Sequence, residues 1–382
     1  MDRHELDRMF DGLKPGPGRE QALLRQLLQE QARRNRPMKR WKSAVLAAVA
    51  AVLLVTAAAA AAVPGLSQKL LAYLGVAPED AHTAQLLAPG AVAVDIVKED
   101  NGATLHVTQV LRDRHCVLVL AELTAPEGTQ LYMGEPDPTG QNTMKGLNGT
   151  GGMVFPDFLD EDGEKLDVTA YSHWRMVDDE DPWDNRVTLM FTFAPNSAQK
   201  AASLWVPARD LAYFDMEKQA VVPVYSGDWS FEVPLPQGEI GWTLKADWAV
   251  GELDGADIYL EELYLSPMTL AVSLRREGGI DFGAPIDEEN AEENEAMYSR
   301  WLSIGNAKQL ILTTRDGETI PLEGTSGTIG IEDKILMNRL TQITDPAKFQ
   351  GGSLTLEWDF THDSQETGSF TLSLDDLAPA EP

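Results

Sequence analysis

Short runs in which apolar and polar residues alternate make up much of the chain after residue 100. A period of two residues places every second side chain on the same face of an extended strand, so these runs predict half-buried β-strands. The run at 117–123 is apolar almost throughout, which is typical of a fully buried strand. The predicted strands fall at 104–110, 117–123, 187–193, 229–235, 270–274, 310–312, 354–360 and 370–374.

Turn signals separate these runs. Three dipeptides typical of tight hairpins lie between strand-like segments: Asn101-Gly102, Asp162-Gly163 and Asp316-Gly317. Helical patterns are fewer, and we expect them at 65–74, 287–302 and 331–340. Short strands divided by turns predict a mainly β protein of sandwich architecture.

Residues 43–63 form an uncharged run of 21 residues, SAVLAAVAAVLLVTAAAAAAV. As a helix this run is about 31 Å long, which matches the hydrocarbon core of a bilayer. Six Arg and Lys side chains lie within 33–42, whereas Lys69 is the only Lys or Arg between the run and Asp95. This asymmetry predicts a single transmembrane helix with a cytoplasmic N-terminus and an extracytoplasmic C-terminal part, in the cell membrane.

Two other interpretations of this run remain open. The alanines at 57–62 offer cleavage sites for a signal peptidase, but secretory signals are about 15–30 residues in all and this run starts at residue 43. A buried helix of a soluble domain is the third interpretation, and an uncharged run of this length is uncommon there.

The segment before the run, 1–42, predicts two short amphipathic helices separated by a Pro- and Gly-rich break at 14–18. Some forty residues are too few to bury a core of their own, so the apolar faces need a cover. A groove in a protein partner, the membrane surface or the apolar face of the other helix supplies it. The candidate partner-binding residues are Leu6, Met9, Phe10 and Leu13 on the first face, and Leu23, Leu24, Leu27 and Leu28 on the second.

The length of the chain and a Pro-rich segment suggest how the predicted extracytoplasmic part is divided. The chain has 382 residues, and Pro234-Leu235-Pro236-Gln237-Gly238 closes one set of predicted strands before another begins. We therefore expect two immunoglobulin-like β-sandwich domains outside the membrane. The predicted order is a cytoplasmic helical segment at 1–42, a transmembrane helix at 43–63, a linker with a short helix at 64–90, a first sandwich at 91–237 and a second at 238–378.

Charge and cysteine content exclude several functions. The formal net charge is -29, and because 1–42 is net +5 the part after residue 63 is net -34. This acidic part of the chain is not expected to bind nucleic acid, because contacts with phosphate groups need clustered Lys and Arg. Cys116 is the only cysteine, which rules out an intramolecular disulfide and any Cys-rich metal site.

No catalytic, metal-binding or cofactor-binding constellation is predicted, so we expect no enzyme and no cofactor. Cys116 lies inside a strand pattern and is best interpreted as a buried structural thiol. His106 and His115 share a predicted hairpin, which their strand positions explain without zinc. The acidic clusters at 157–167 and 178–184 are interpreted as solvated turns, because position one of a calcium loop counted from Gly163 is Phe158.

Several segments together resemble a known family. The order of basic N-terminal helices, one span, VDIVKEDNGATLHVTQVLRDRHCVLVLAEL, WSFEVPLP and ADIYLEELYLSPMTLAVSL is similar to that of bacterial single-pass membrane proteins described as anti-sigma-factor-like. Their β-rich ectodomain is classed as a domain of unknown function. The most specific parts are the hairpin at 100–123 and Leu265-Ser266-Pro267, which are structural signatures and assign no site residues.

The resemblance implies a membrane-anchored regulator whose cytoplasmic segment holds a sigma factor, with an extracytoplasmic sensing or binding region of undefined ligand. The zinc-binding members of this class carry a His and Cys-x-x-Cys group, whereas residues 1–42 contain no cysteine. Any sigma-factor contact would therefore be metal-free and depend on the leucine faces. The alternative is a cell-surface binding or structural protein whose cytoplasmic segment has no regulatory role.

Overall fold

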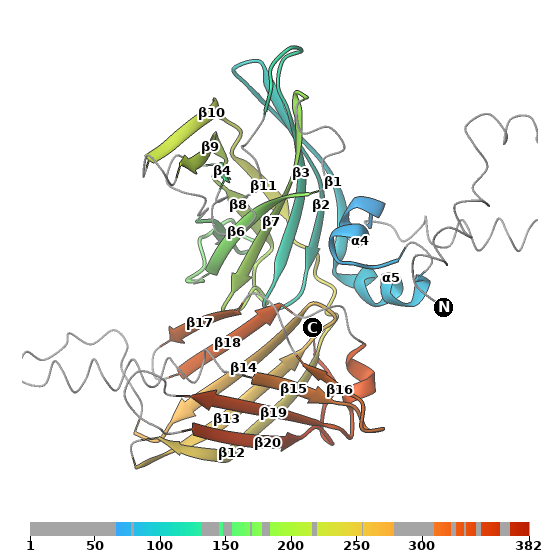
Figure 1. The fold of residues 1–382 in the computed structure, drawn as a ribbon, viewed down its shortest axis with the longest axis vertical. Coiled ribbons are helices and arrows are strands. Elements are labelled where there is room, and N and C mark those ends of the chain that lie inside the picture. The colour runs from blue at the N-terminus through green and yellow to red at the C-terminus, as the bar shows by residue number, and fades with distance from the viewer. Residues whose placement is uncertain are drawn as a thin grey trace, which may run out of the picture. The chain divides into compact units, whose positions relative to one another are not determined.

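A computed structural model describes most of the chain after residue 65 (Figure 1). Every described residue belongs to one compact unit of the chain, Ala58–Pro382. The predicted cytoplasmic helices, the predicted span and the predicted helix at 287–302 lie outside the described residues. In the described part, no helix has the length and apolarity needed to cross a bilayer. The described residues are 66–77, 80–131, 145–147, 155–168, 170–177, 184–215, 220–253, 255–278, 309–321, 326–331, 334–340, 345–359 and 367–381.

The described part begins with helices α4 (Gln68–Tyr73) and α5 (Ala81–Leu87), followed by the 3-10 turn η1 (Ala88–Gly90). Each α-helix has a side-chain cap, because Ser67 Oγ accepts from Leu70 N at 3.2 Å and Asp80 Oδ1 accepts from Thr83 N at 3.0 Å. Helix α4 confirms the helix predicted within 65–74.

Residues 91–234 form three antiparallel sheets, with strand orders β1-β2-β3-β7-β6, β10-β9-β4 and β11-β8-β5. The strands of the five-stranded sheet are β1 (Ala91–Asp100), β2 (Ala103–Arg112), β3 (Val117–Thr124), β6 (Ala170–Val177) and β7 (Arg186–Pro195). The strands of the two smaller sheets are β4 (Lys145–Leu147), β5 (Asp157–Leu159), β8 (Ser203–Val206), β9 (Arg209–Asp215), β10 (Ala220–Asp228) and β11 (Phe231–Pro234).

Strand β3 is buried on both faces. Val117, Val119, Ala121 and Leu123 point into a core shared with β5, β8, β9 and β11. Leu118 and Leu120 point the other way, into a second apolar cluster that contains residues of α4 and α5. The two helices accordingly lie on the face of the five-stranded sheet opposite β8 and β9 (Figure 1). This double burial is why the sequence of the strand is apolar almost throughout.

The predicted hairpin turns take the backbone conformations that their residues favour. Asn101 and Gly102 join β1 to β2 with φ angles of 48° and 79°, as a two-residue turn with left-handed residues requires. Gly163 and Gly317 also have positive φ, at 81° and 87°.

Residues 242–379 form two further antiparallel sheets, with orders β17-β18-β14-β13-β12-β21 and β16-β15-β19-β20. Leucines of both sheets, with Ile258, Val272 and Phe349, make one core. The strands are β12 (Trp242–Leu253), β13 (Ala256–Leu265), β14 (Thr269–Arg276), β15 (Gln309–Thr313), β16 (Thr319–Pro321), β17 (Ser326–Ile331), β18 (Lys334–Leu340), β19 (Ser353–Asp359), β20 (Thr367–Ser373) and β21 (Ala378–Pro379), with the 3-10 turn η2 (Pro346–Phe349) before β19.

The helix predicted at 331–340 is wrong, because Lys334–Leu340 is strand β18. Lys, Leu, Met and Arg favour helix when isolated, but here β18 pairs with β14 along seven register positions and with β17 on its other side. Pairing on both edges outweighs a local preference of a few tenths of a kcal/mol per residue. The predicted mainly β fold class is confirmed at the level of several antiparallel sheets with few helices.

Candidate functional site

The turn between β2 and β3 carries an unusual amount of buried charge. Its sequence is Arg112-Asp113-Arg114-His115-Cys116, and Asp113 N donates to Cys116 O at 2.8 Å. Among the described residues, every buried Asp, Glu, Arg or Lys side chain lies in this turn. Charged groups are rarely buried without partners, so the partners identify what the turn does.

Arg112 binds main-chain carbonyl groups on two other segments. Its Nη1 donates to Ala201 O at 3.0 Å and to Pro236 O at 2.9 Å, and its Nη2 donates to Ala198 O at 2.6 Å and to Gln199 O at 3.2 Å. Burial lowers the pKa of this guanidinium from its usual value. Arg112 thus fixes the end of β2 to the loop before β8 and to the segment that leaves β11.

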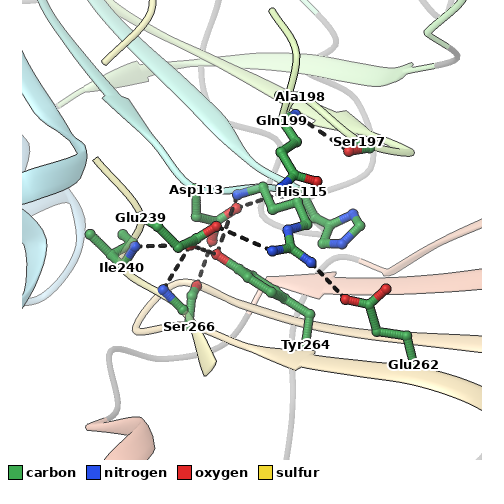
Figure 2. Close-up of polar contacts among 12 residues, drawn as sticks. Asp113, His115, Ser197, Ala198, Gln199, Glu239, Ile240, Glu262, Tyr264 and Ser266 are labelled. Carbon is green, nitrogen blue, oxygen red and sulfur yellow. Dashed lines mark hydrogen bonds and ion pairs between the residues drawn. The ribbon is translucent and has the colours of Figure 1, made fainter. Parts of the chain in front are cut away.

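Asp113 reaches into residues that follow β13. Its Oδ2 accepts from Ser266 Oγ at 2.5 Å and its Oδ1 accepts from His115 N at 2.8 Å (Figure 2). The same Oδ2 also accepts from Thr269 Oγ1 at 2.5 Å. Ser266 Oγ itself accepts from the backbone N–H groups of Met268 and Thr269. Complete burial raises the pKa of Asp113 to about 6, although these hydrogen bonds oppose the rise.

Arg114 makes the second connection to the β12–β14 sheet. Its Nη1 donates to Glu262 Oε1 at 2.6 Å, and its Nη2 lies 3.6 Å from Glu239 Oε2. The guanidinium carbon lies 5.0 Å from the centre of the Tyr264 ring, a cation–π distance. Arg114 N also donates to the Tyr264 hydroxyl at 3.3 Å, so one tyrosine contacts both ends of this residue.

Glu239 completes the group. Its Oε1 accepts from the Tyr264 hydroxyl at 2.7 Å and from the backbone N–H groups of Ile240 and Gly241 (Figure 2). Burial, with Asp113 and Glu239 nearby, raises the pKa of Tyr264, so its hydroxyl stays protonated and remains a donor. The sheets of 91–234 and the sheets of 242–379 are called here the two sheet systems. We call the seven residues that join them the clasp: Asp113, Arg114, Glu239, Glu262, Tyr264, Ser266 and Thr269.

His115 and Cys116 pack beside the clasp. The imidazole meets the Tyr264 ring edge-on, with centroids 5.1 Å apart. Burial and the adjacent Arg114 charge lower the pKa of His115 to about 4, so the ring is neutral at pH 7. Cys116 is fully buried, and burial raises the pKa of its thiol, which confirms the predicted structural role.

The two histidines of the hairpin have different surroundings. His106 Nε2 lies 2.7 Å from Asp95 Oδ1 on β1, whereas His115 packs against Tyr264. In the described part of the chain, no group of three or more His, Cys, Asp or Glu side chains is placed to hold a metal ion.

In the acidic loop after β5, the carboxylate of Asp160 accepts from the backbone N–H groups of Asp162 and Glu164, at 3.0 and 2.9 Å. This is the arrangement of a carboxylate that stabilises its own turn. The second acidic cluster lies outside the described residues except for Asp184, and so do all eight candidate partner-binding residues between Leu6 and Leu28.

The clasp can hold two sheet systems in a fixed relation, and sequence reasoning found only part of it. Ser266 was marked by the resemblance as a structural signature, but its contact with Asp113 was not predicted. The available signal was the charged sequence Arg112–His115 between the alternating strand β2 and the almost wholly apolar strand β3. This turn places four charged or titratable side chains in succession.

Comparisons with known proteins add a distant structural likeness. No protein-family model and no curated protein sequence matches the chain. Among solved structures, the conserved domain protein from Bacillus anthracis is 11% identical, with a TM-score of 0.42. The likeness covers 74% of this chain and 91% of that one. Similarity of this degree says nothing about function.

Proposed function

We propose that this chain is a membrane-anchored regulator of the anti-sigma-factor type. In this proposal 1–42 lie in the cytoplasm, 43–63 cross the bilayer, and the remainder forms an extracytoplasmic sensing or binding region with two immunoglobulin-like sandwiches. The charge asymmetry around the uncharged run and the family resemblance support this topology.

One structural observation carries the proposal. The segment that directly follows the predicted span is part of the core of the β-rich body. Leu70, Leu71 and Leu87 of α4 and α5 are at most 3% exposed and pack with Leu118 and Leu120 of β3. A movement of this sheet would therefore be passed to the chain that leads into the membrane, as a transmembrane regulator requires.

The clasp supports the same function. It joins 91–234 to 242–379 through buried hydrogen bonds and ion pairs, and Met268 of the second part lies in the apolar cluster that holds α4. An event on either sheet system can then reach α4 through packed residues rather than through a flexible linker.

The proposed cytoplasmic partner is a sigma factor, bound through the two predicted leucine faces. A short helix in a groove derives most of its binding energy from a few buried anchors. Changing Leu24 and Leu28 to Ala together removes two such anchors, each contributing about 1.5–3 kcal/mol. We expect the affinity to fall at least tenfold and transcription dependent on that sigma factor to rise, while the protein remains in the membrane.

The experiment is affinity purification of the full chain from its own bacterium, with RNA sequencing of the same strains. Gln26→Ala with Gln29→Ala is the matched control, since these residues lie off the leucine face of the predicted helix. If no sigma factor co-purifies with the wild type and the leucine variant changes no transcript, the regulator proposal fails. A cell-surface binding or structural protein would then be the better account.

A further inference from the structure

A cavity of about 430 Å³ lies between the start of α4 and the outer face of the five-stranded sheet. Its wall includes Lys69 from α4, His106 and Thr108 from β2, Glu122 from β3 and Thr188 from β7. Cavities of roughly 300–1,000 Å³ hold small molecules in many proteins. The described residues therefore include a site of suitable size immediately beside α4.

Both signs of charge meet on one side of this cavity. Lys69 Nζ lies 3.3 Å from Glu122 Oε2 and donates to Thr188 Oγ1 at 3.2 Å. The Lys69 and Glu122 side chains are 57% and 34% exposed, so solvent screens their attraction and the pair contributes little to stability. Each charge is consequently available to a ligand at small cost.

Three polar side chains that line the cavity have defined hydrogen-bond partners. The Thr108 hydroxyl donates to Leu120 O at 3.4 Å and retains its oxygen lone pairs as acceptors. Thr188 is only 8% exposed, and its hydroxyl oxygen accepts from Lys69 Nζ. Gln109 Oε1 accepts from Ser67 N at 3.0 Å, which fixes the start of α4 beside the cavity.

We propose that this cavity binds a small zwitterion of the α-amino acid class, as a free amino acid or short peptide. The ligand carboxylate would lie on Lys69 and Thr188, and the ligand ammonium on Glu122. A ligand with one charge gains one of these residues and meets repulsion from the other, whereas a zwitterion satisfies both. The carboxylate and the ammonium of an α-amino acid are attached to the same carbon atom. They can therefore contact the adjacent charges of Lys69 and Glu122 at the same time.

Ligand binding would also change the contacts of α4. Lys69 precedes the buried pair Leu70 and Leu71, so a ligand that replaces its contact with Glu122 alters how the start of α4 is held. In this way the bound amino acid would be the extracytoplasmic signal. This coupling depends on the proposed regulatory function, but the binding itself does not.

The test is isothermal titration of the full chain in detergent micelles with the twenty common amino acids and alanylalanine. Acetate and methylammonium serve as single-charge probes. We expect saturable binding of at least one zwitterion and no heat from either single-charge probe at the same concentration. If no zwitterion in this panel binds the folded protein at millimolar concentration, the proposal is wrong.

Variants locate the site. Lys69→Met and Glu122→Gln should each weaken binding at least tenfold, and the reversal Lys69→Glu should abolish it. Combining Lys69→Glu with Glu122→Lys restores an ion pair and should recover part of the binding, which excludes misfolding as the cause. The matched control is Lys165→Met with Asp157→Asn, an ion pair of similar exposure (68% and 34%) beyond this cavity, and it should leave binding unchanged.

Binding that persists unchanged in Lys69→Met overturns the proposed site. Binding with the expected variant pattern, but without any sigma factor on the purified chain, retains the amino-acid site and rejects the regulatory function. The two proposals can thus fail separately.

Discussion

Asp113 and His115 are both fully buried in one turn, and burial shifts their ionisation in opposite directions. The pKa of Asp113 rises from 3.8 to about 6, so its contribution to stability is complete below pH 3.8 and is lost as the pH rises to about 6. The pKa of His115 falls from 6.5 to about 4, so its contribution is complete above pH 6.5 and is lost as the pH falls to about 4. Between about pH 4 and pH 6 the two contributions offset each other.

Removing one of these two titratable groups should therefore reveal the pH-dependent contribution of the other to stability. We expect the free energy of unfolding of Asp113→Asn, relative to wild type, to decline by on the order of 3 kcal/mol as the pH falls from 6 to 4. His115→Gln should change in the opposite sense over the same range. Urea unfolding at several pH values measures both differences, and a difference that does not vary with pH would contradict the assigned ionisation.

The hydroxyl of Tyr264 has a structural effect that its ring does not supply. Tyr264→Phe keeps the buried ring but leaves Arg114 N and Glu239 Oε1 each without one hydrogen-bond partner. We expect the free energy of unfolding to fall by about 1–3 kcal/mol. Tyr225→Phe is the control, because its hydroxyl donates to Asn101 O at an exposed position, and it should cost at most about 1 kcal/mol. Equal losses in the two variants would argue against a special role for the clasp hydroxyl.

At the scale of elements, α4 is a short helix whose position depends on packing. Leu70 is 1% exposed, and its truncation to Ala should lower the free energy of unfolding by about 2–5 kcal/mol. Ala72→Ser, on the exposed side of the same helix, should change it by less than about 0.5 kcal/mol. Thermal unfolding of the full chain in detergent gives both values. A small effect of Leu70→Ala would mean that α4 is not firmly held on the sheet.

Elements were predictable where the local pattern and the tertiary environment agree. The alternation at 187–193 and 270–274 predicted β7 and β14, since one face of each strand had to be apolar. The helix α4 was also predicted, but its docking site on β3 was not. Strand β18 could not be predicted, because its residues favour helix locally and its strand conformation depends on pairing with β14 and β17. The clasp could not be predicted for a similar reason. Asp113 and Ser266 are 153 positions apart, and no local sequence pattern indicates that they are in contact.

At the scale of the whole molecule, the segment 234–241 differs from what its composition suggests. Its Pro- and Gly-rich sequence is typical of an exposed linker, yet Leu235 N donates to Ala202 O at 2.8 Å and Arg112 donates to Pro236 O. A Cβ atom on Gly238 would overlap the carbonyl oxygen of Pro89, so the chain also passes close to η1.

We therefore expect limited thermolysin digestion to leave 234–241 intact, because cleavage needs a backbone that can leave its hydrogen bonds. Mass spectrometry of the fragments identifies the cut sites. A clean cut in this segment that yields two folded pieces would show that the clasp does not unite the two sheet systems. Arg112→Ala should increase cleavage there, since it removes donors to Ala198, Ala201 and Pro236.

The clasp also sets an order of events during synthesis. The N-terminal partners appear first, and at roughly 5–20 residues per second the 156 residues from Asp113 to Thr269 take about 8–30 s to follow. Until Ser266 is made, near the end of that interval, the charged turn has neither of its two hydroxyl partners, although β2 and β3 have already emerged. A nascent chain thus passes through a stage in which its first sheets are present and its buried carboxylate is still hydrated. Closure of the clasp is a late step, and any factor that retains the emerging chain before residue 266 would keep the protein in that open stage.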